Sequence, residues 1–284
     1  MNVDAAYAYC RRIAHKHGGN FSVGFRFLPR VKRRAVYAAY AYCRWADDIA
    51  DEPSGDADDV LERLDEWQRE LDACYAGAPH HPITIALADA LQHFSTPKSA
   101  FVALIDGCRQ DTWKTRYETF EELLQYCDLV ATSISDISLS IYGFKTDAAP
   151  VHGRNLAIAL QLTNVTRDVG DDLPRNRIYL PRTELLQFGV TEEELFAGAE
   201  NERVEKLIAF QIDRAEGYFR AAEPLLAELD FDARFPTLLM GGVYATVLGK
   251  LKKDPLTVIR RRLSLSTLQK VMVVGSRMLR PHFV

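Results

Sequence analysis

The sequence predicts an all-α protein. Three observations lead to this fold class: apolar residues recur with a helical period along most of the chain, alternating strand patterns bounded by turn dipeptides are missing, and the breaks between periodic segments are short. Hydrophobic residues make up 48% of the 284 residues and charged residues 26%, as in an ordinary globular protein. We therefore expect roughly ten helices in a single domain that spans residues 1–284.

Three segments carry the helical pattern most clearly. Residues 58–77 place an apolar stripe on one face and end in a glycine. Residues 119–143 begin with Thr119, carry two acids in the first turn and end in Gly143, which are typical signals for the start and end of a helix. Residues 201–229 form another long amphipathic segment. Each of the three is expected to form one helix.

Composition excludes several classes of protein. The net charge is −4, which argues against a general nucleic-acid binder. The five cysteines are scattered without a CxxC pair, so we expect neither a disulfide framework nor a zinc site, and a reducing cytosol fits better. The N-terminus is charged where a signal peptide would be apolar, and no run approaches the roughly 18 to 20 apolar residues that span a bilayer. The predicted location is cytoplasmic.

The first chemical signal is a row of acids that follows an apolar, aromatic helix. In the stretch RWADDIADEP, Asp47 and Asp51 are four residues apart, so their carboxylates share one helical face about 5–6 Å apart at Cβ. Two like charges at this spacing destabilise a helix mildly, and a divalent cation between them would reverse that effect. Mg²⁺ is usually held by one or two carboxylates together with phosphate oxygens and water. An isolated pair of this kind is more often a solvated helix end.

A second polar row makes the metal interpretation the better one. In QLTNVTRDVGDDLPRNRIYLP, Asn164, Asp168 and Asp172 follow at intervals of four and so lie along one helical face. Asp171 is one step round the helix and is a less certain ligand. Two such rows suggest two helices facing each other across a cavity, with Mg²⁺ ions around a diphosphate. Guanidinium groups match phosphate oxygens bidentately, and arginines accompany both rows, at Arg44, Arg167, Arg175 and Arg177.

These motifs resemble a known family. The pairing of CRWADDIAD with NVTRDVGDDLPRNRIYLP is similar to the squalene/phytoene synthases, which join two prenyl diphosphates head to head. The resemblance extends to the stretches 20–51, 106–127 and 258–271 and so covers nearly the whole chain. It implies a single isoprenoid-synthase helical bundle around a central apolar cavity. It also implies a prenyl diphosphate substrate and about two or three Mg²⁺ ions that help the diphosphate to leave.

The resemblance assigns roles residue by residue. Asp47 and Asp51 match the first metal-binding motif, and the row at 164, 168 and 172 matches the second. Arg44 and Arg167 match residues that contact diphosphate, as does one of Arg261 and Arg262, of which Arg261 is taken first. The positions that line the reaction cavity are matched by Phe21, Tyr40, Gln161 and Tyr244. The predicted site is therefore Tyr40, Asp47, Asp51, Asp168 and Asp172 as catalytic residues, Asn164 as a further metal ligand, and Phe21, Arg44, Tyr126, Gln161, Arg167, Arg177, Tyr244 and Arg261 as substrate-binding residues.

Different stretches of the chain resemble different branches of the family. Some stretches look like the bacterial hopanoid-pathway squalene or hydroxysqualene synthases, whereas NVTRDVGDD looks more like phytoene and dehydrosqualene synthases. The chain also departs from the common family pattern with Asp128, Ser133 and Ser135 in YCDLVATSIS. We take a C15 substrate and a squalene or hydroxysqualene product as the first interpretation. Phytoene or dehydrosqualene synthesis is the alternative, and a non-catalytic assembly or binding relative is the less favoured one.

Other questions stay open at this point. No GxGxxG follows a strand, so there is no Rossmann domain, but this does not exclude NADPH. The basic C-terminal segment is either a surface helix whose arginines contact diphosphate or a peripheral contact with the inner face of the membrane, where Leu268, Val271 and Met272 would share a face. The oligomeric state is not predicted.

Overall fold

The computed structural model describes residues 1–17, 24–52 and 56–266, and in the C-terminal stretch 268–269, 272–273, 275–276 and 282–283. These residues form helices and no strand, so the all-α prediction is confirmed. Their β-type backbone pairing is limited to two isolated bridges, Arg116 with Ile178 and Phe144 with Leu229. No helix in the described ranges is long and apolar enough to cross a membrane.

The helices fall into two compact units, each assembled from three separate stretches. Unit 1 comprises Met1–Trp113, Thr132–Pro150 and Ala227–Thr237. Unit 2 comprises Lys114–Ala131, Val151–Leu226 and Leu238–Val284. The single domain expected over residues 1–284 stays a prediction.

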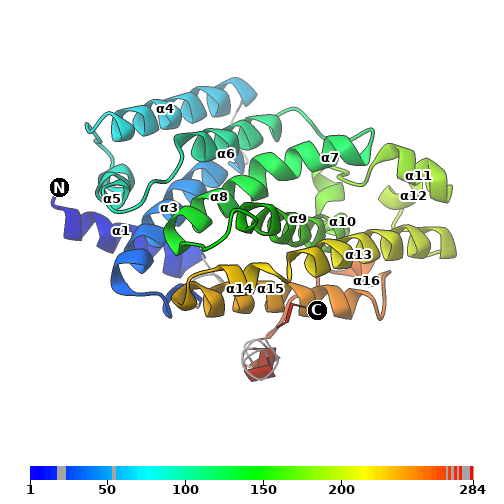
Figure 1. Ribbon diagram of the computed structural model, residues 1–284. Helices are drawn as coiled ribbons and strands as arrows, with labels where there is room; N and C mark the ends of the chain where they lie inside the picture. The colour runs from blue at the N-terminus through cyan, green and yellow to red at the C-terminus, as the bar shows by residue number, and fades with distance from the viewer. Residues whose placement is uncertain are drawn as a thin grey trace. The chain divides into compact units, whose positions relative to one another are not determined.

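Unit 1 is built around one central helix, α3 (Figure 1). Its core is aromatic: the ring of Tyr42 is fully buried, stacks on Trp67 with ring centroids 4.8 Å apart and meets the edge of Phe101 at 5.0 Å. The Trp67 indole N–H also donates to the Tyr42 carbonyl at 3.2 Å, so the polar edge of the buried ring is satisfied. The helices of this unit are α1 (Val3–His17), α3 (Arg30–Ala50), α4 (Ala57–Tyr75), α5 (Pro82–Leu91), α6 (Lys98–Gln110) and α8 (Ser133–Tyr142).

Unit 2 combines long helices with several short ones and with short helical turns. Helix α13 packs against α11, and the four-residue α10 packs against α16. The elements that lie wholly or mostly in this unit are α7 (Phe120–Cys127), a π-helical turn (Asp128–Thr132), α9 (Ala149–Arg167), α10 (Val169–Asp172), a 3₁₀ turn (Leu173–Arg175), α11 (Arg182–Phe188), α12 (Glu192–Phe196), α13 (Glu202–Ala222), α15 (Phe231–Leu251) and α16 (Thr257–Arg260). Helix α14 (Leu225–Glu228) begins in unit 2 and ends in unit 1, because the chain passes from one unit to the other after Leu226.

Two of the three long helices expected from the sequence are interrupted, so the described residues form more and shorter helices than expected. Residues 58–77 behave as predicted, as α4. The segment 119–143 starts at a Thr119 cap whose side chain accepts from the Glu122 N–H, but it divides into α7, the π-helical turn and α8. The segment 201–229 ends its main helix at Ala222, because a proline at position 224 cannot continue the hydrogen-bond ladder.

Gly143 ends α8 where a side chain would not fit. Its φ is +76°, and a Cβ built there would overlap the Asp230 carboxylate. Gly143→Ala is expected to lower the free energy of unfolding by about 2–4 kcal/mol, combining backbone strain with the overlap. Gly77→Ala is the matched control, because Gly77 has φ +81° and no atom within 4 Å of an added Cβ. Urea unfolding followed by circular dichroism measures both, and equal losses would show that the overlap costs nothing.

Candidate active site

The first acid row lies at the C-terminal end of α3. Asp47 is half-buried, and its Oδ1 accepts a hydrogen bond from the Cys108 thiol at 3.7 Å. Burial raises the pKa of Asp47 to about 7; the charge of Arg44 works against this rise, and that of Asp51 adds to it. Asp51 caps α3 through its own N–H, which donates to the Asp47 carbonyl at 2.8 Å. The two predicted ligands thus share one helix end.

This helix end is an unfavourable place for negative charge. The C-terminus of a helix carries a partial negative charge from its unpaired carbonyl groups, so each carboxylate there is destabilised. Arg44 offsets one acid by pairing with Asp48, four residues on. Asp111, which caps α6, adds a further negative charge that raises the pKa of Asp47. Sequence reasoning named neither Asp111 nor Cys108 as site residues, although both lie in the stretch 106–127 that carried the family resemblance.

The second polar row does not lie on one continuous helix as predicted. Helix α9 ends at Arg167, and Asp168 has φ −97° and ψ 10° before α10 begins. The break accompanies a close approach, because a Cβ added at Gly170 would lie 2.6 Å from the Val258 carbonyl oxygen. The spacing survives the break: the Asp168 N–H donates to the Asn164 carbonyl and the Asp172 N–H to the Asp168 carbonyl, both at 2.9 Å.

Asn164 presents an unsatisfied oxygen in this row. Its Oδ1 is buried and accepts no hydrogen bond from the described residues. Its amide nitrogen donates to Gln161 Oε1 at 3.4 Å, and its side chain is also hydrogen-bonded to Tyr244. Burial raises the pKa of Tyr244, while Arg167 and Asn164 lower it. A buried carbonyl oxygen without a donor is costly in a protein and is a natural ligand for a hard cation.

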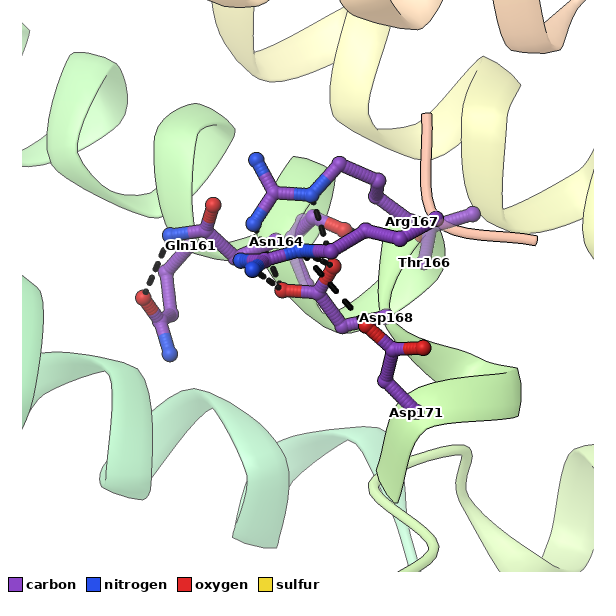
Figure 2. A network of polar contacts seen from close by, with 8 residues as sticks. Gln161, Asn164, Thr166, Arg167, Asp168 and Asp171 are labelled. Atoms are coloured by element: carbon purple, nitrogen blue, oxygen red, sulfur yellow. Dashed lines mark hydrogen bonds and ion pairs between the residues drawn. The ribbon is translucent and has the colours of Figure 1, made fainter. Parts of the chain in front are cut away.

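Asp168 is held by two guanidinium groups. Arg167 donates from Nε to Oδ1 at 2.7 Å and from an NH2 group to Oδ2 at 2.5 Å (Figure 2). Arg262 reaches the same two oxygens at 2.8 and 3.2 Å from 94 positions further along the chain, and its Nε lies 3.7 Å from Asp171. Both C-terminal arginines left open by the sequence are exposed, and Arg262 is the one that pairs with this row.

Asp172 closes the row with a different environment. Burial, followed by the charge of Asp168, raises the pKa of Asp172 to about 6, and Arg177 and Arg175 lower it. The Arg177 N–H also donates to the Asp172 carbonyl at 3.1 Å. Both predicted rows therefore contain a carboxylate whose pKa is raised by its surroundings, and a bound cation would lower that pKa again.

The predicted aromatic residues belong to separate clusters. In unit 2, Tyr126 packs against Tyr117 and Tyr179, with ring centroids 5.5 and 5.4 Å apart. In unit 1, Tyr40 meets Phe25 edge to face at 6.1 Å, and burial raises the pKa of Tyr40 to about 12. Phe21 lies outside the described residues.

The departure from the family pattern at Asp128 has a local explanation. Asp128 opens the π-helical turn and accepts two hydrogen bonds from Arg154, at 2.7 and 2.8 Å. A planar guanidinium paired with both carboxylate oxygens is the strong form of this contact. The Asp128 side chain is therefore used in an ion pair within unit 2.

The donors fit Mg²⁺ as two partial sites. In the part of the chain that the structure describes, no three His, Cys, Asp or Glu side chains gather as a ready metal cluster. Mg²⁺ does not require one, since one or two carboxylates with phosphate oxygens and water suffice. The orphaned oxygen of Asn164 and the raised pKa values of Asp47 and Asp172 are the observations that favour a cation. The prediction that the two rows face each other stays a prediction, because they belong to different units.

Known proteins resemble the chain over nearly its whole length. The 15-cis-phytoene synthase of Synechocystis sp. is 35% identical over 291 aligned residues, which cover 98% of this chain and 86% of that protein. The 15-cis-phytoene synthase of Synechococcus elongatus is also 35% identical, with 98% and 94% covered.

Solved structures agree with this. The squalene synthase of Alicyclobacillus acidocaldarius has a TM-score of 0.84 and 31% identity, covering 89% of this chain and 95% of that one. A dehydrosqualene synthase solved with a ligand has a TM-score of 0.89 and 27% identity, covering 99% and 98%. These neighbours confirm the predicted isoprenoid-synthase fold. The sequence model of the squalene/phytoene synthase family matches residues 14–269, and the chain therefore belongs to this family.

Proposed function

We propose that this protein is a Mg²⁺-dependent prenyltransferase that joins two prenyl diphosphates head to head. The observation that carries the proposal is the gathering of Asn164, Arg167, Asp168, Tyr244 and Arg262 at one place in unit 2. This set combines oxygen ligands for a hard cation with guanidinium groups for phosphate. A leaving diphosphate needs both kinds of group.

Mg²⁺ ions would be held at each row by its own residues, Asp47 and Asp51 at the first row and Asn164, Asp168 and Asp172 at the second. When bound, they supply positive charge that stabilises the departing diphosphate. Arg167 and Arg262, which now neutralise Asp168, have the bidentate geometry to bind the phosphate oxygens instead. Arg44 beside the first row and Arg177 beside the second would add further contacts to the diphosphate.

The aromatic residues protect the carbon skeleton. Loss of diphosphate leaves an allylic cation, which water would quench, so its surroundings must be apolar. The rings of Tyr40, Tyr126 and Tyr244 are half-buried or buried and offer π faces that stabilise a passing cation. The cation from one substrate adds to a double bond of a second substrate, and loss of a proton closes the ring. The product is a cyclopropylcarbinyl diphosphate, with one diphosphate and one proton released. A second ionisation then rearranges the skeleton.

Two substrate lengths have support. A C15 substrate would give a C30 product, such as squalene, hydroxysqualene or dehydrosqualene, and the squalene and dehydrosqualene synthase structures support this candidate. A C20 substrate would give C40 phytoene, and the two phytoene synthases at 35% identity support that one at least as well. The products differ in how the last cation ends: by proton loss, by addition of water or by hydride transfer from NADPH.

One assay separates these candidates. The protein is incubated with farnesyl diphosphate or geranylgeranyl diphosphate, with and without NADPH, and the products are identified by mass spectrometry. We expect a C30 or a C40 product that disappears when EDTA removes the Mg²⁺. A shorter head-to-tail product or a cyclic terpene would place the enzyme in another class of prenyl chemistry. Tight substrate binding without turnover would support a non-catalytic relative.

A further inference from the structure

Unit 1 carries an exposed apolar patch that the proposed reaction does not use. Phe231 is 84% exposed, Phe27 53% and Val31 52%. Arg26 and Arg30 are exposed beside them, and Arg33 is half-buried. We call these six residues the aromatic–basic patch. None of them is a candidate metal ligand or cavity residue.

Two stretches far apart in the sequence build this patch. The Phe27 ring meets Phe235 edge to face with centroids 4.6 Å apart, and Phe235 lies one helical turn after Phe231 in α15. A Cβ added at Gly24 would lie 3.5 Å from the Pro236 carbonyl oxygen, so the backbones also approach closely. In Figure 1 the segment before α3 lies next to the start of α15.

An ion-pair network around Lys32 holds these stretches together. Lys32 donates to Asp232 at 2.8 Å, to Asp230 at 3.1 Å and to the Tyr142 carbonyl at 2.7 Å. The Lys32 side chain is only 16% exposed, so these contacts fix α3 to the start of α15. The exposed rings are therefore presented by an anchored platform.

The charge of the patch indicates the sign of its partner. Residues 24–34 contain five basic residues and no acid, in a chain whose net charge is −4. Lys32 is paired with two carboxylates, and Arg34 pairs with Asp4 at 2.9 Å. No ion pair with a carboxylate of the described ranges involves Arg26, Arg30 or Arg33, and Arg33 donates to the Arg26 carbonyl at 3.1 Å. Three guanidinium groups around exposed aromatic rings would complement an anionic surface that also accepts apolar groups.

We propose that the aromatic–basic patch docks the protein on an anionic lipid bilayer. Phenylalanine rings insert at the boundary between headgroups and acyl chains, and arginines bind anionic lipid phosphates. An acidic protein partner would pair with the arginines but would not explain why the Phe231 ring is 84% exposed. The inference goes beyond the proposed reaction and does not depend on it.

The patch differs from the membrane contact suggested by the C-terminal sequence. Leu268 and Met272 in that segment are exposed, at 69% and 57%, and Val271 lies outside the described residues. Phe283 of that segment is fully buried and its N–H donates to Glu223 Oε1 at 2.7 Å, so the segment has an anchor of its own, in unit 2.

Vesicle co-sedimentation of the full chain tests the proposal without any substrate. Sucrose-loaded vesicles of phosphatidylcholine alone are compared with vesicles that contain phosphatidylglycerol. We expect binding to the anionic vesicles that weakens with salt. Phe27→Ser with Phe231→Ser should weaken partitioning tenfold or more. Arg26→Glu with Arg30→Glu should weaken it at least 25-fold, since each basic residue near the surface contributes about fivefold.

Matched controls come from elsewhere on the surface. Leu186→Ser removes an apolar side chain that is 69% exposed, and Arg69→Glu reverses an exposed arginine. Both should bind like the parent, and all variants should keep the parent's turnover in detergent.

Patch variants that bind vesicles as tightly as the parent would overturn the proposal. It would equally be overturned if light scattering showed that the patch variants convert a dimer into monomers, because the patch would then be an interface between two copies. An inactive enzyme that still binds vesicles through the patch would refute the proposed function alone.

Discussion

Asp168→Asn is expected to lower kcat/KM for prenyl diphosphate by about 10³-fold. Asp168 is the centre of the second polar row: four hydrogen bonds from Arg167 and Arg262 converge on its two oxygens. Asparagine keeps the shape and one oxygen but removes the negative charge that would hold a divalent cation. Steady-state kinetics at saturating Mg²⁺ measure the loss, and far-ultraviolet circular dichroism should show unchanged helix content.

Asp171→Asn is the matched control for this substitution. Asp171 lies three residues after Asp168 and is exposed. Its carboxylate is 3.7 Å from Nε of Arg262, the arginine that also pairs with Asp168. If the row at 164, 168 and 172 is the ligand set, Asp171→Asn should retain activity within about tenfold. Equal losses in the two variants would show that general negative charge, rather than the row, matters. Full Mg²⁺-dependent turnover in Asp168→Asn would remove the metal assignment.

The local part of this site could be predicted from the sequence, and its long-range part could not. The interval of four between Asn164, Asp168 and Asp172 is a property of helical backbone, and it survives because the i to i−4 hydrogen bonds persist through the break after α9. The pairing of Asp168 with Arg262 spans 94 positions and depends on tertiary packing. The adjacent arginines 261 and 262 look alike in the sequence, so only the fold distinguishes them.

Burial also limits what the sequence can predict. Asp47 and Asp51 have the same residue type and belong to one helix, yet the structure half-buries Asp47 against the Cys108 thiol of another helix. That burial is what raises the pKa of Asp47 to about 7. No spacing rule contains this information, because the contact joins positions 61 apart.

Helix ends also divide into those that local sequence signals predict and those that depend on tertiary contacts. Thr119 and Gly143 mark real termini because capping and positive φ are local requirements. The interruption between them, at Asp128–Thr132, coincides with the ion pair from Asp128 to Arg154 of α9, which is a tertiary contact. The proline at 224 was a local signal for the end of α13 and could have been used.

A second large effect is expected away from the site, at Glu184. The Glu184 side chain is 8% exposed and pairs with Arg214, whose NH1 lies 3.0 Å from Oε2. Gln211 donates to the same carboxylate at 2.6 Å. The Arg214 guanidinium also lies over the rings of Phe120 and Phe210, at 3.8 and 4.7 Å from their centroids. Glu184→Ala should lower the free energy of unfolding by about 3–5 kcal/mol, because it leaves a buried cation without its partner.

Urea unfolding of three further variants tests this explanation. Lys252→Ala removes an exposed lysine that bridges Asp213 and Glu216, and it should cost about 1 kcal/mol or less. Replacing the buried pair together, as Glu184→Leu with Arg214→Met, should recover most of the loss, because no unpaired charge remains. Arg214→Lys keeps the charge but loses the second parallel hydrogen bond and the stacking on two rings, so it should fall between the parent and Glu184→Ala. If the double variant were as unstable as Glu184→Ala, the loss would come from packing volume between α11 and α13 and not from the stranded charge.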